Sequence, residues 1–334
     1  MRDSLGRPLH DLRISVTDRC NFRCVYCMPR EVFGRDFAFL ERAELLTFEE
    51  IARVTRILTG LGVEKVRLTG GEPLLRRDLE RLIEQLARID AIRDLTLTTN
   101  GSLLTRAKAK SLADAGLRRI TISVDSLDDH TFREMSDVDV SVDTILEAVD
   151  AASQAGLHPI KIDMVVIRGR NETSIVDVAR RFRGTGSIVR FIEYMDVGNT
   201  NGWRMADVVS AADIRSAIAT EWPIERVEAN YLGEVAERWR YIDGQGEIGI
   251  ITSVTQPFCG ACSRLRLSAA GELYTCLFAG KGHDVRALLR SDASDDEVRE
   301  FVSGIWRARD DRYSEIRSEA TESLRKVEMS HIGG

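Results

Sequence analysis

The sequence predicts an α/β protein: an incomplete TIM-type (β/α)6 barrel closed by a C-terminal α+β extension. Strand-like and helix-like segments alternate through the first two-thirds of the 334 residues, and the strand-like segments carry apolar residues at every second position. After Asp196 this pattern changes. Repeated strand–helix units favour parallel strands joined by right-handed connections. An open, doubly wound sheet is the alternative arrangement.

Six strands and five helices are expected in the repeated region. The strands are expected at Leu12–Thr17, Lys65–Thr69, Leu95–Thr98, Arg119–Val124, Ile160–Val166 and Ile188–Glu193. The amphipathic segments between them are 47–60, 76–89, 102–115, 141–155 and 171–184. Three of these end at a glycine (Gly60, Gly116 and Gly156), which is a common helix stop.

Apolar and polar residues alternate along each strand, so that each has one apolar and one polar face, and this division favours a barrel. In the first strand Leu12, Ile14 and Val16 lie on one face, and Arg13, Ser15 and Thr17 on the other. The next four strands repeat this division. A parallel sheet covered by helices on both faces is apolar on both, so one polar face predicts helices outside and a polar interior. An antiparallel sheet with one solvated face is the alternative.

The region after the repeated units is expected to be built differently. A short helix near 211–220, hairpin strands around 233–242 and 246–254, and helices at 284–290 and 295–308 are expected there, with Asp243-Gly244 as the turn of the hairpin. We therefore divide the chain into a barrel domain, residues 1–200, and a C-terminal region, residues 201–334.

Composition narrows the class of protein. The net charge is −6 and hydrophobic residues make up 43 % of the chain, enough for an extensive core. The acidic balance argues against nucleic acid as a partner. No run approaches the roughly 18 apolar residues of a membrane span, and the first residues lack the apolar core of a secretory signal. A cytoplasmic location is expected, where cysteines serve metals or catalysis.

Three cysteines, Cys20, Cys24 and Cys27, stand at CxxxCxxC spacing after the first strand. Structural zinc normally has four protein ligands, and no fourth is near. A four-iron cluster held by three thiolates instead keeps one iron free for another ligand. The amino and carboxylate groups of S-adenosylmethionine (SAM) suit that iron. With an aromatic residue, Tyr26, before the last cysteine, the loop resembles the radical-SAM signature.

The other three cysteines, Cys259, Cys262 and Cys276, form a second triplet, which leaves no thiol as a fourth ligand for either group. His283 is the one histidine placed to complete a zinc site, so zinc stays an alternative for this triplet.

Polar residues follow the strands, where barrel folds place active sites. Four of the strands are followed by such residues: Gly70-Gly71-Glu72-Pro73, Thr98-Thr99-Asn100-Gly101, Ser123-Val124-Asp125 and Met195-Asp196.

Basic residues on the polar face or beside Cys262 add a second signal: Arg13, Arg67, Lys161, Arg264 and Arg266. Such a cluster calls for a multiply anionic ligand, and a nucleoside triphosphate fits. Internal pairing with Asp125 and Asp163 is the alternative.

Nearly the whole chain resembles the GTP 3′,8-cyclase family of molybdenum cofactor biosynthesis. The resemblance rests on residues 12–24, 67–74 and 191–198, on the second cysteine triplet and on the final Gly333-Gly334. It implies two [4Fe–4S] clusters, one held by Cys20, Cys24 and Cys27 for SAM and an auxiliary one held by Cys259, Cys262 and Cys276. It also implies SAM contacts from Tyr26, Gly71, Ser123 and Met195, and GTP contacts from Arg13, Arg67, Thr98, Lys161, Arg264, Leu265 and Arg266.

The implied reaction is a radical cyclisation of GTP. Hydrogen is removed from ribose C3′, and that carbon then bonds to guanine C8, giving (8S)-3′,8-cyclo-7,8-dihydroguanosine 5′-triphosphate. The implied partners are GTP, an external electron donor, the next-step enzyme cyclic pyranopterin monophosphate synthase, and a second copy of the chain, as in the family's dimers. Another radical-SAM enzyme with an auxiliary cluster and a non-enzymatic metal-binding scaffold are the alternatives.

The chain departs from the family pattern in three segments: a longer loop at Arg30–Glu44, Ser136-Asp137-Val138-Asp139 in place of a Gly-Arg pair, and Lys326-Val327-Glu328 near the end. The final residues Met329–Gly334 show no periodicity. The resemblance implies that this Gly-Gly tail reaches back into the barrel beside the substrate.

Overall fold

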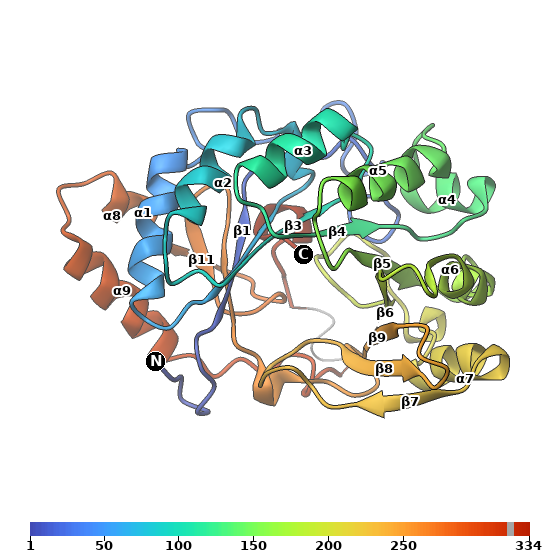
Figure 1. Ribbon diagram of the computed structural model, residues 1–334. Coiled ribbons are helices and arrows are strands. Elements are labelled where there is room, and N and C mark those ends of the chain that lie inside the picture. The colour runs from blue at the N-terminus through green and yellow to red at the C-terminus, as the bar shows by residue number, and fades with distance from the viewer. Residues whose placement is uncertain (319–323) are drawn as a thin grey trace.

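A single curved sheet of twelve strands organises the computed structural model, which describes residues 1–318 and 324–334 (Figure 1). The strand order across the sheet is β12-β11-β10-β1-β2-β3-β4-β5-β6-β9-β8-β7. The six strands expected from the sequence are therefore neighbours in chain order.

The strands are β1 (Asp11–Ser15), β2 (Lys65–Thr69), β3 (Asp94–Thr99), β4 (Arg119–Ser123), β5 (Lys161–Val166), β6 (Ile188–Glu193), β7 (Ile224–Val227), β8 (Glu237–Tyr241), β9 (Glu247–Ile251), β10 (Arg264–Leu267), β11 (Glu272–Tyr274) and β12 (His283–Asp284). The helices are α1 (Phe48–Thr59), α2 (Leu79–Ala87), α3 (Arg106–Asp114), α4 (Asp129–Ser136), α5 (Val142–Gln154), α6 (Ile175–Phe182), α7 (Ala211–Glu221), α8 (Arg286–Leu289), α9 (Asp295–Arg307) and α11 (Met329–Ile332).

Parallel pairing joins β1 through β6 in sequence. This excludes the antiparallel alternative. A doubly wound sheet would reverse its strand order at a switch point, whereas here each strand pairs with the next along the chain, so that alternative is wrong as well. The α/β prediction is confirmed.

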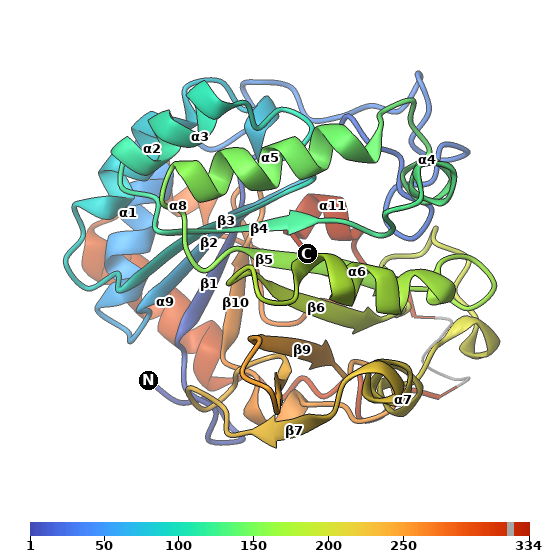
Figure 2. The ribbon, with the colours of Figure 1, turned by 45° about the vertical axis from the view of Figure 1, so that its right-hand side comes forward.

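The two faces of the sheet differ in the way the alternation predicts. Leu12, Ile14, Val66 and Leu68 belong to the main apolar core, together with the buried sides of the helices. Helices α1, α2, α3, α5 and α6 lie on the outer side of the curve (Figure 2). The polar residues of the same strands therefore face the inner side.

Two strands from the C-terminal region extend the parallel array, which the sequence did not predict. β9 pairs in parallel with β6, and β10 pairs in parallel with β1, with Arg13 opposite Arg266. β10 directly follows the second cysteine pair, and its first residue, Arg264, lies opposite Asp11 at the start of β1. The second triplet therefore lies at the amino ends of these strands, whereas the first triplet follows the carboxyl end of β1. The expected hairpin is present as β8 and β9, and is joined by β7.

Two helices were missed. The short α4 begins at Asp128, whose carboxylate accepts a hydrogen bond from the backbone N–H of Thr131. The other, α11, lies in the tail, where the sequence shows no periodicity. It contacts β1 on the inner side of the sheet, and Ile332 is fully buried. A single turn is too short to show a helical pattern, and its burial depends on distant strands.

In the part of the chain that the structure describes, no helix has the length and apolar character needed to cross a membrane.

Leu265 gives a test of the two faces. Its side chain is completely buried in the apolar core, between the inward-facing Arg264 and Arg266. We expect Leu265→Ala to lower the free energy of unfolding by about 2–5 kcal/mol, because it leaves a cavity. Leu232→Ala, at a largely exposed leucine, is the matched control and should change it by less than about 0.5 kcal/mol. Equal denaturation midpoints for the two variants would contradict the assigned faces.

Candidate functional site

The first cysteine loop connects β1 to the segment before α1. Arg23 donates hydrogen bonds to the carbonyl oxygens of Cys20 and Phe22, at 2.7 Å each, and so fixes the turn. The backbone N–H of Phe22 points at the Cys20 sulfur, 3.4 Å away, and the Asn100 amide lies 3.9 Å from the same atom. N–H groups directed at sulfur suit a thiolate ligand.

The long loop at residues 30–44 packs beside this turn. The Phe39 ring lies under the guanidinium groups of Arg19 and Arg23, at 5.6 and 5.8 Å from its centroid. The backbone N–H of Leu40 binds the Asp18 carboxylate. Residues 30–44 therefore pack against the cysteine loop.

Paired glycines after β2 allow the cysteine loop to approach the sheet closely. Gly70 has a φ of +148°, and a Cβ there would lie 2.4 Å from the carbonyl oxygen of Thr17. A Cβ on Gly71 would lie 2.3 Å from the carbonyl oxygen of Arg19, next to Cys20. The following Glu72 is buried, and its carboxylate accepts hydrogen bonds from Thr99 and from the backbone N–H of Asn100.

A cavity of about 280 Å³ lies on the inner side of the sheet, and all six cysteines line it. The four residues expected to contact SAM (Tyr26, Gly71, Ser123 and Met195) line it too. So do most of those expected to contact GTP: Arg13, Arg67, Thr98, Arg264 and Arg266. The structure thus brings the predicted residues together, although their individual roles stay predictions.

Leu265 and Lys161 are placed differently from the others. The Leu265 side chain is fully buried in the apolar core, and Leu265 does not line the cavity, so its contact with GTP stays a prediction. Lys161 lines a smaller adjoining cavity of about 30 Å³. Arg13, Arg67, Arg190 and Arg264 line both cavities, which joins them into one basic surface.

The residues at both triplets suit an iron–sulfur cluster better than a single metal ion. Among the residues that the structure describes, no group of three or more His, Cys, Asp or Glu side chains is close enough to hold one ion. His283, the candidate fourth ligand for zinc, is exposed on β12 and belongs to no such group in the described part of the chain. Three thiolates without a fourth protein ligand match a four-iron cluster that keeps one iron open to another ligand.

The second triplet is the more electropositive of the two. Burial raises the pKa of the Cys276 thiol to about 11 and that of the Cys20 thiol to about 12. Burial acts in the same direction on Cys262, but the guanidinium groups of Arg264 and Arg309 outweigh it and lower the pKa of that thiol to about 6. Arg309 donates to the Cys262 sulfur at 3.2 Å. The second site is therefore built to hold negative charge.

The inner face carries more cations than carboxylates to pair with them. Asp163 pairs with Arg190, at 2.6 Å, a residue that the sequence analysis missed. The available signal was the position of Arg190 as a cation in the middle of β6, between apolar residues. In residues 1–318 and 324–334, the five expected cations (Arg13, Arg67, Lys161, Arg264 and Arg266) have no ion-pair partner. The internal-pairing alternative is therefore wrong for these five.

Burial and mutual repulsion shift the pKa values of this cluster. Burial, reinforced by the nearby Arg190, Arg119 and Arg67, lowers the pKa of Lys161 to about 6. The same causes lower the pKa of Arg67 to about 10, burial first and then Arg190. Asp125 is not a partner of the cations, because its carboxylate accepts hydrogen bonds from the Tyr26 hydroxyl and from the backbone N–H of Val165. A polyanionic ligand would relieve this repulsion.

The C-terminal tail enters the cavity. Gly334 lines it, and the carbonyl oxygen of Gly333 accepts a hydrogen bond from Arg266. Gly333 has a φ of +75°, and a Cβ there would lie 2.4 Å from Thr69. The segment before the tail is anchored by Lys326, whose ammonium group donates to the buried Asp196 carboxylate at 2.8 Å.

Comparison with known proteins defines the class first. Residues 14–182 match the family model of the Radical SAM superfamily. Streptococcus suis SuiB bound to S-adenosylmethionine has the same fold, with a TM-score of 0.60 and 16 % identity over 88 % of this chain and 68 % of SuiB. Methylornithine synthase (PylB) has a TM-score of 0.51 and 20 % identity over 64 % of this chain and 62 % of its own. This superfamily implies an iron–sulfur cluster and SAM binding.

Closer relatives then identify the family. Residues 187–315 match the model described as Molybdenum Cofactor Synthesis C. The GTP 3′,8-cyclase of Acidothermus cellulolyticus is 54 % identical over 100 % of this chain and 99 % of its own length. That of Staphylococcus carnosus is 49 % identical over 99 % and 98 %. The chain belongs to the GTP 3′,8-cyclase family.

Gly71 offers a test of the first cysteine loop. Because its Cβ would meet the backbone of Arg19, we expect Gly71→Ala to displace the Arg19–Cys20 turn and to reduce iron uptake on anaerobic reconstitution. Gly304→Ala is the control, since a Cβ on this glycine in α9 meets open space. The measurement is iron bound per chain at equal folded protein. If both variants take up as much iron as the wild type, Gly71 does not have this role.

Proposed function

We propose that this chain is a GTP 3′,8-cyclase, which converts GTP to (8S)-3′,8-cyclo-7,8-dihydroguanosine 5′-triphosphate in the first step of molybdenum cofactor biosynthesis. One observation carries the proposal: a single cavity is lined by two cysteine triplets and by buried cations without carboxylate partners. The full-length relatives named GTP 3′,8-cyclase support it. The likeness to SuiB bound to its precursor peptide is at 15 % identity and speaks for the fold alone, so it does not favour the peptide-modifying alternative.

Two [4Fe–4S] clusters would be held at the two triplets, the SAM cluster by Cys20, Cys24 and Cys27 and the auxiliary cluster by Cys259, Cys262 and Cys276. When bound, the SAM cluster and SAM together supply a carbon radical that can remove hydrogen from ribose C3′. Tyr26, Gly71, Ser123 and Met195 would position SAM between the cysteine loop and the ends of β2, β4 and β6.

GTP would lie across the cavity with its triphosphate against the basic surface. Arg13, Arg67, Arg190 and Lys161 belong to four different strands and converge on the smaller cavity, so several phosphate oxygens could be bound at once. Thr98 lies 3.3 Å from the Arg67 guanidinium group and orients it. Arg264 and Arg266 would bind GTP beside the second triplet. Fixing both ends of the substrate holds ribose C3′ and guanine C8 at reacting distance and keeps water out.

We also propose a division of the chain into two parts. Residues 1–200 form an incomplete (β/α)6 barrel, and residues 201–334 form a C-terminal region that closes it, carries the auxiliary site and supplies the Gly-Gly tail. The reaction requires an external electron donor, and its product would pass to cyclic pyranopterin monophosphate synthase.

To test this function, the protein is reconstituted anaerobically, and SAM is then added with one nucleotide at a time. The wild type should bind roughly eight irons per chain, as two four-iron clusters require, and should release cyclised product with GTP only. Cys20→Ala should abolish SAM cleavage, whereas Cys259→Ala should keep the first cluster and lose cyclisation. Normal cyclisation by Cys259→Ala, or SAM cleavage that is indifferent to GTP, would contradict the proposal.

The lowered pKa of Lys161 predicts that the protein takes up a proton when GTP binds. The pKa of about 6 in the free protein leaves the amine mostly neutral at pH 7.5, and a triphosphate beside it should raise that pKa. GTP affinity should therefore rise as the pH falls from about 8 to about 7. Calorimetric titrations in two buffers with different ionisation enthalpies measure the protons taken up.

Two controls accompany this titration. Lys161→Met should remove most of the proton uptake and weaken GTP binding by about 1.5–3 kcal/mol, the scale of a hydrogen bond to a charged group. Guanosine, which lacks phosphates, should bind without proton uptake. The same uptake in Lys161→Met as in the wild type would show that another group binds the proton.

A further inference from the structure

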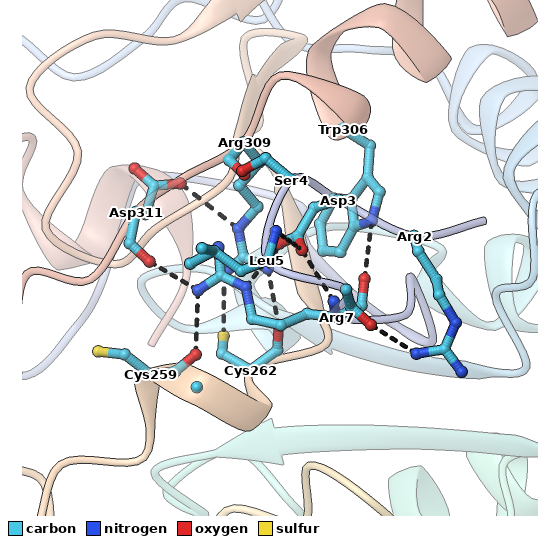
Figure 3. A network of polar contacts seen from close by, with 12 residues as sticks. Arg2, Asp3, Ser4, Leu5, Arg7, Cys259, Cys262, Trp306, Arg309 and Asp311 are labelled. Carbon is cyan, nitrogen blue, oxygen red and sulfur yellow. Dashed lines mark hydrogen bonds and ion pairs between the residues drawn. The ribbon is translucent and has the colours of Figure 1, made fainter.

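Two buried arginines, distant in sequence, converge on the second cysteine loop (Figure 3). Arg7, near the N-terminus, donates to the carbonyl oxygen of Cys259 at 3.0 Å. Arg309, which follows α9, donates to the carbonyl oxygen of Cys262 at 2.7 Å and to its sulfur at 3.2 Å. Each arginine thus holds one member of the CxxC pair.

A carboxylate shared by both arginines keeps them in place. Asp3 pairs with Arg7 at 2.5 Å and with Arg309 at 3.4 Å, and Figure 3 shows it between the two. The side chains of all three residues are 0–1 % exposed. The Arg309 guanidinium group also lies 4.6 Å from the centre of the buried Trp306 ring. A cation enclosed on all sides has little freedom to turn away from Cys262.

Packing of the N-terminal segment against α9 does not require two buried arginines and a buried aspartate. Burying two guanidinium groups is costly, and an apolar cluster could join the N-terminal segment to α9 at lower cost. The contacts instead deliver a fixed positive charge and an N–H donor to one cysteine sulfur. Because the Cys262 backbone carbonyl also binds Arg309, the guanidinium group stays beside this cysteine whichever rotamer the thiol adopts.

Hydrogen bonds to ligand sulfurs and nearby charge are among the factors that set the reduction potential of an iron–sulfur cluster. A four-iron cluster with three thiolates gains one negative charge when it accepts one electron. A permanent cation 3.2 Å from a ligand sulfur stabilises that reduced state more than the oxidised one. No proton needs to move with the electron.

We propose that Arg309 raises the reduction potential of the auxiliary cluster, and that Asp3 and Arg7 are positioning residues that hold it there. The electron comes from the external donor that the reaction already requires. The inference rests on the proposed auxiliary site at Cys259, Cys262 and Cys276, and adds to it a cluster-tuning role for the N-terminal segment.

The experiment is a redox titration followed by electron paramagnetic resonance. It uses the full-length chain with Cys20, Cys24 and Cys27 changed to alanine, so that only the auxiliary cluster gives a signal. Arg309→Gln, which removes the charge, should shift the midpoint potential downward. Arg309→Lys, which keeps the charge but loses the forked donor, should shift it less. Arg307→Gln removes an exposed arginine at the end of α9 and should leave the potential unchanged.

Asp3→Asn provides a second variant that leaves Arg309 in the chain. Loss of the Asp3 anion would by itself raise the potential, so a lower potential in this variant reports that Arg309 has moved away from Cys262. In the protein without clusters, Asp3→Asn should speed amide hydrogen exchange in residues 1–9. That exchange measurement does not depend on iron. If Arg309→Gln fails to fold, Arg309→Lys and Asp3→Asn decide the question.

The two proposals fail in different ways. If the alanine-substituted chain takes up no iron, the auxiliary site itself is wrong. If it takes up about four irons and the potential of Arg309→Gln, or of Arg309→Lys and Asp3→Asn together, equals that of Arg307→Gln, then the auxiliary site stands and the tuning role of Arg309 is overturned.

Discussion

Buried positive charge on the inner face of the sheet is the constraint on which the rest of the structure depends. Parallel strands turn every second side chain inward, and here those positions include Arg13, Arg67 and Lys161, with Asp163 already paired to Arg190. Desolvation and mutual repulsion both disfavour the charged forms. A polyanion bound on this face would relieve both effects. The apolar outer face, with its continuous core, supplies the stability.

The C-terminal region completes the site as well as covering it. β10 pairs with β1 and so sets Arg266 opposite Arg13, on the side of the cavity where the second cysteine triplet lies. Arg266 in turn binds the carbonyl oxygen of Gly333 in the tail. The second cysteine loop is also held from both ends of the chain, by Arg7 and by Arg309. The first loop is held by Arg23 within the loop and also by distant partners: the backbone N–H of Val25 donates to the carbonyl oxygen of Met135, and the Tyr26 hydroxyl donates to Asp125.

Most of the correct predictions came from patterns between residues that are close in the sequence. Among β1 to β6, strands β2 and β6 have the expected bounds and the other four differ by one or two residues at their ends. Strands β8 and β9 are shorter than expected, and β7, β10, β11 and β12 were not predicted. The cysteine triplets, the glycine pair and the inward cations were recognisable because each depends on spacing along a strand or within one loop. Arg190 and the helix α4 were missed. Arg190 lies between apolar residues of β6, and its pairing with Asp163 becomes visible only when β5 and β6 are placed side by side.

The sequence by itself determined the α/β class, the two unlike faces of the sheet and the six cysteines as two groups of three, because strand periodicity and ligand spacing are local properties. Tertiary structure alone decided that the two groups line one cavity and that the Leu265 side chain points away from it. The place of the tail in that cavity was implied only by the family resemblance. Tertiary structure also decided that Asp3, Arg7 and Arg309 meet beside the loop of Cys259 and Cys262. Those facts depend on strand pairing and on charge partners hundreds of residues apart, for which a sequence read along its length carries no signal.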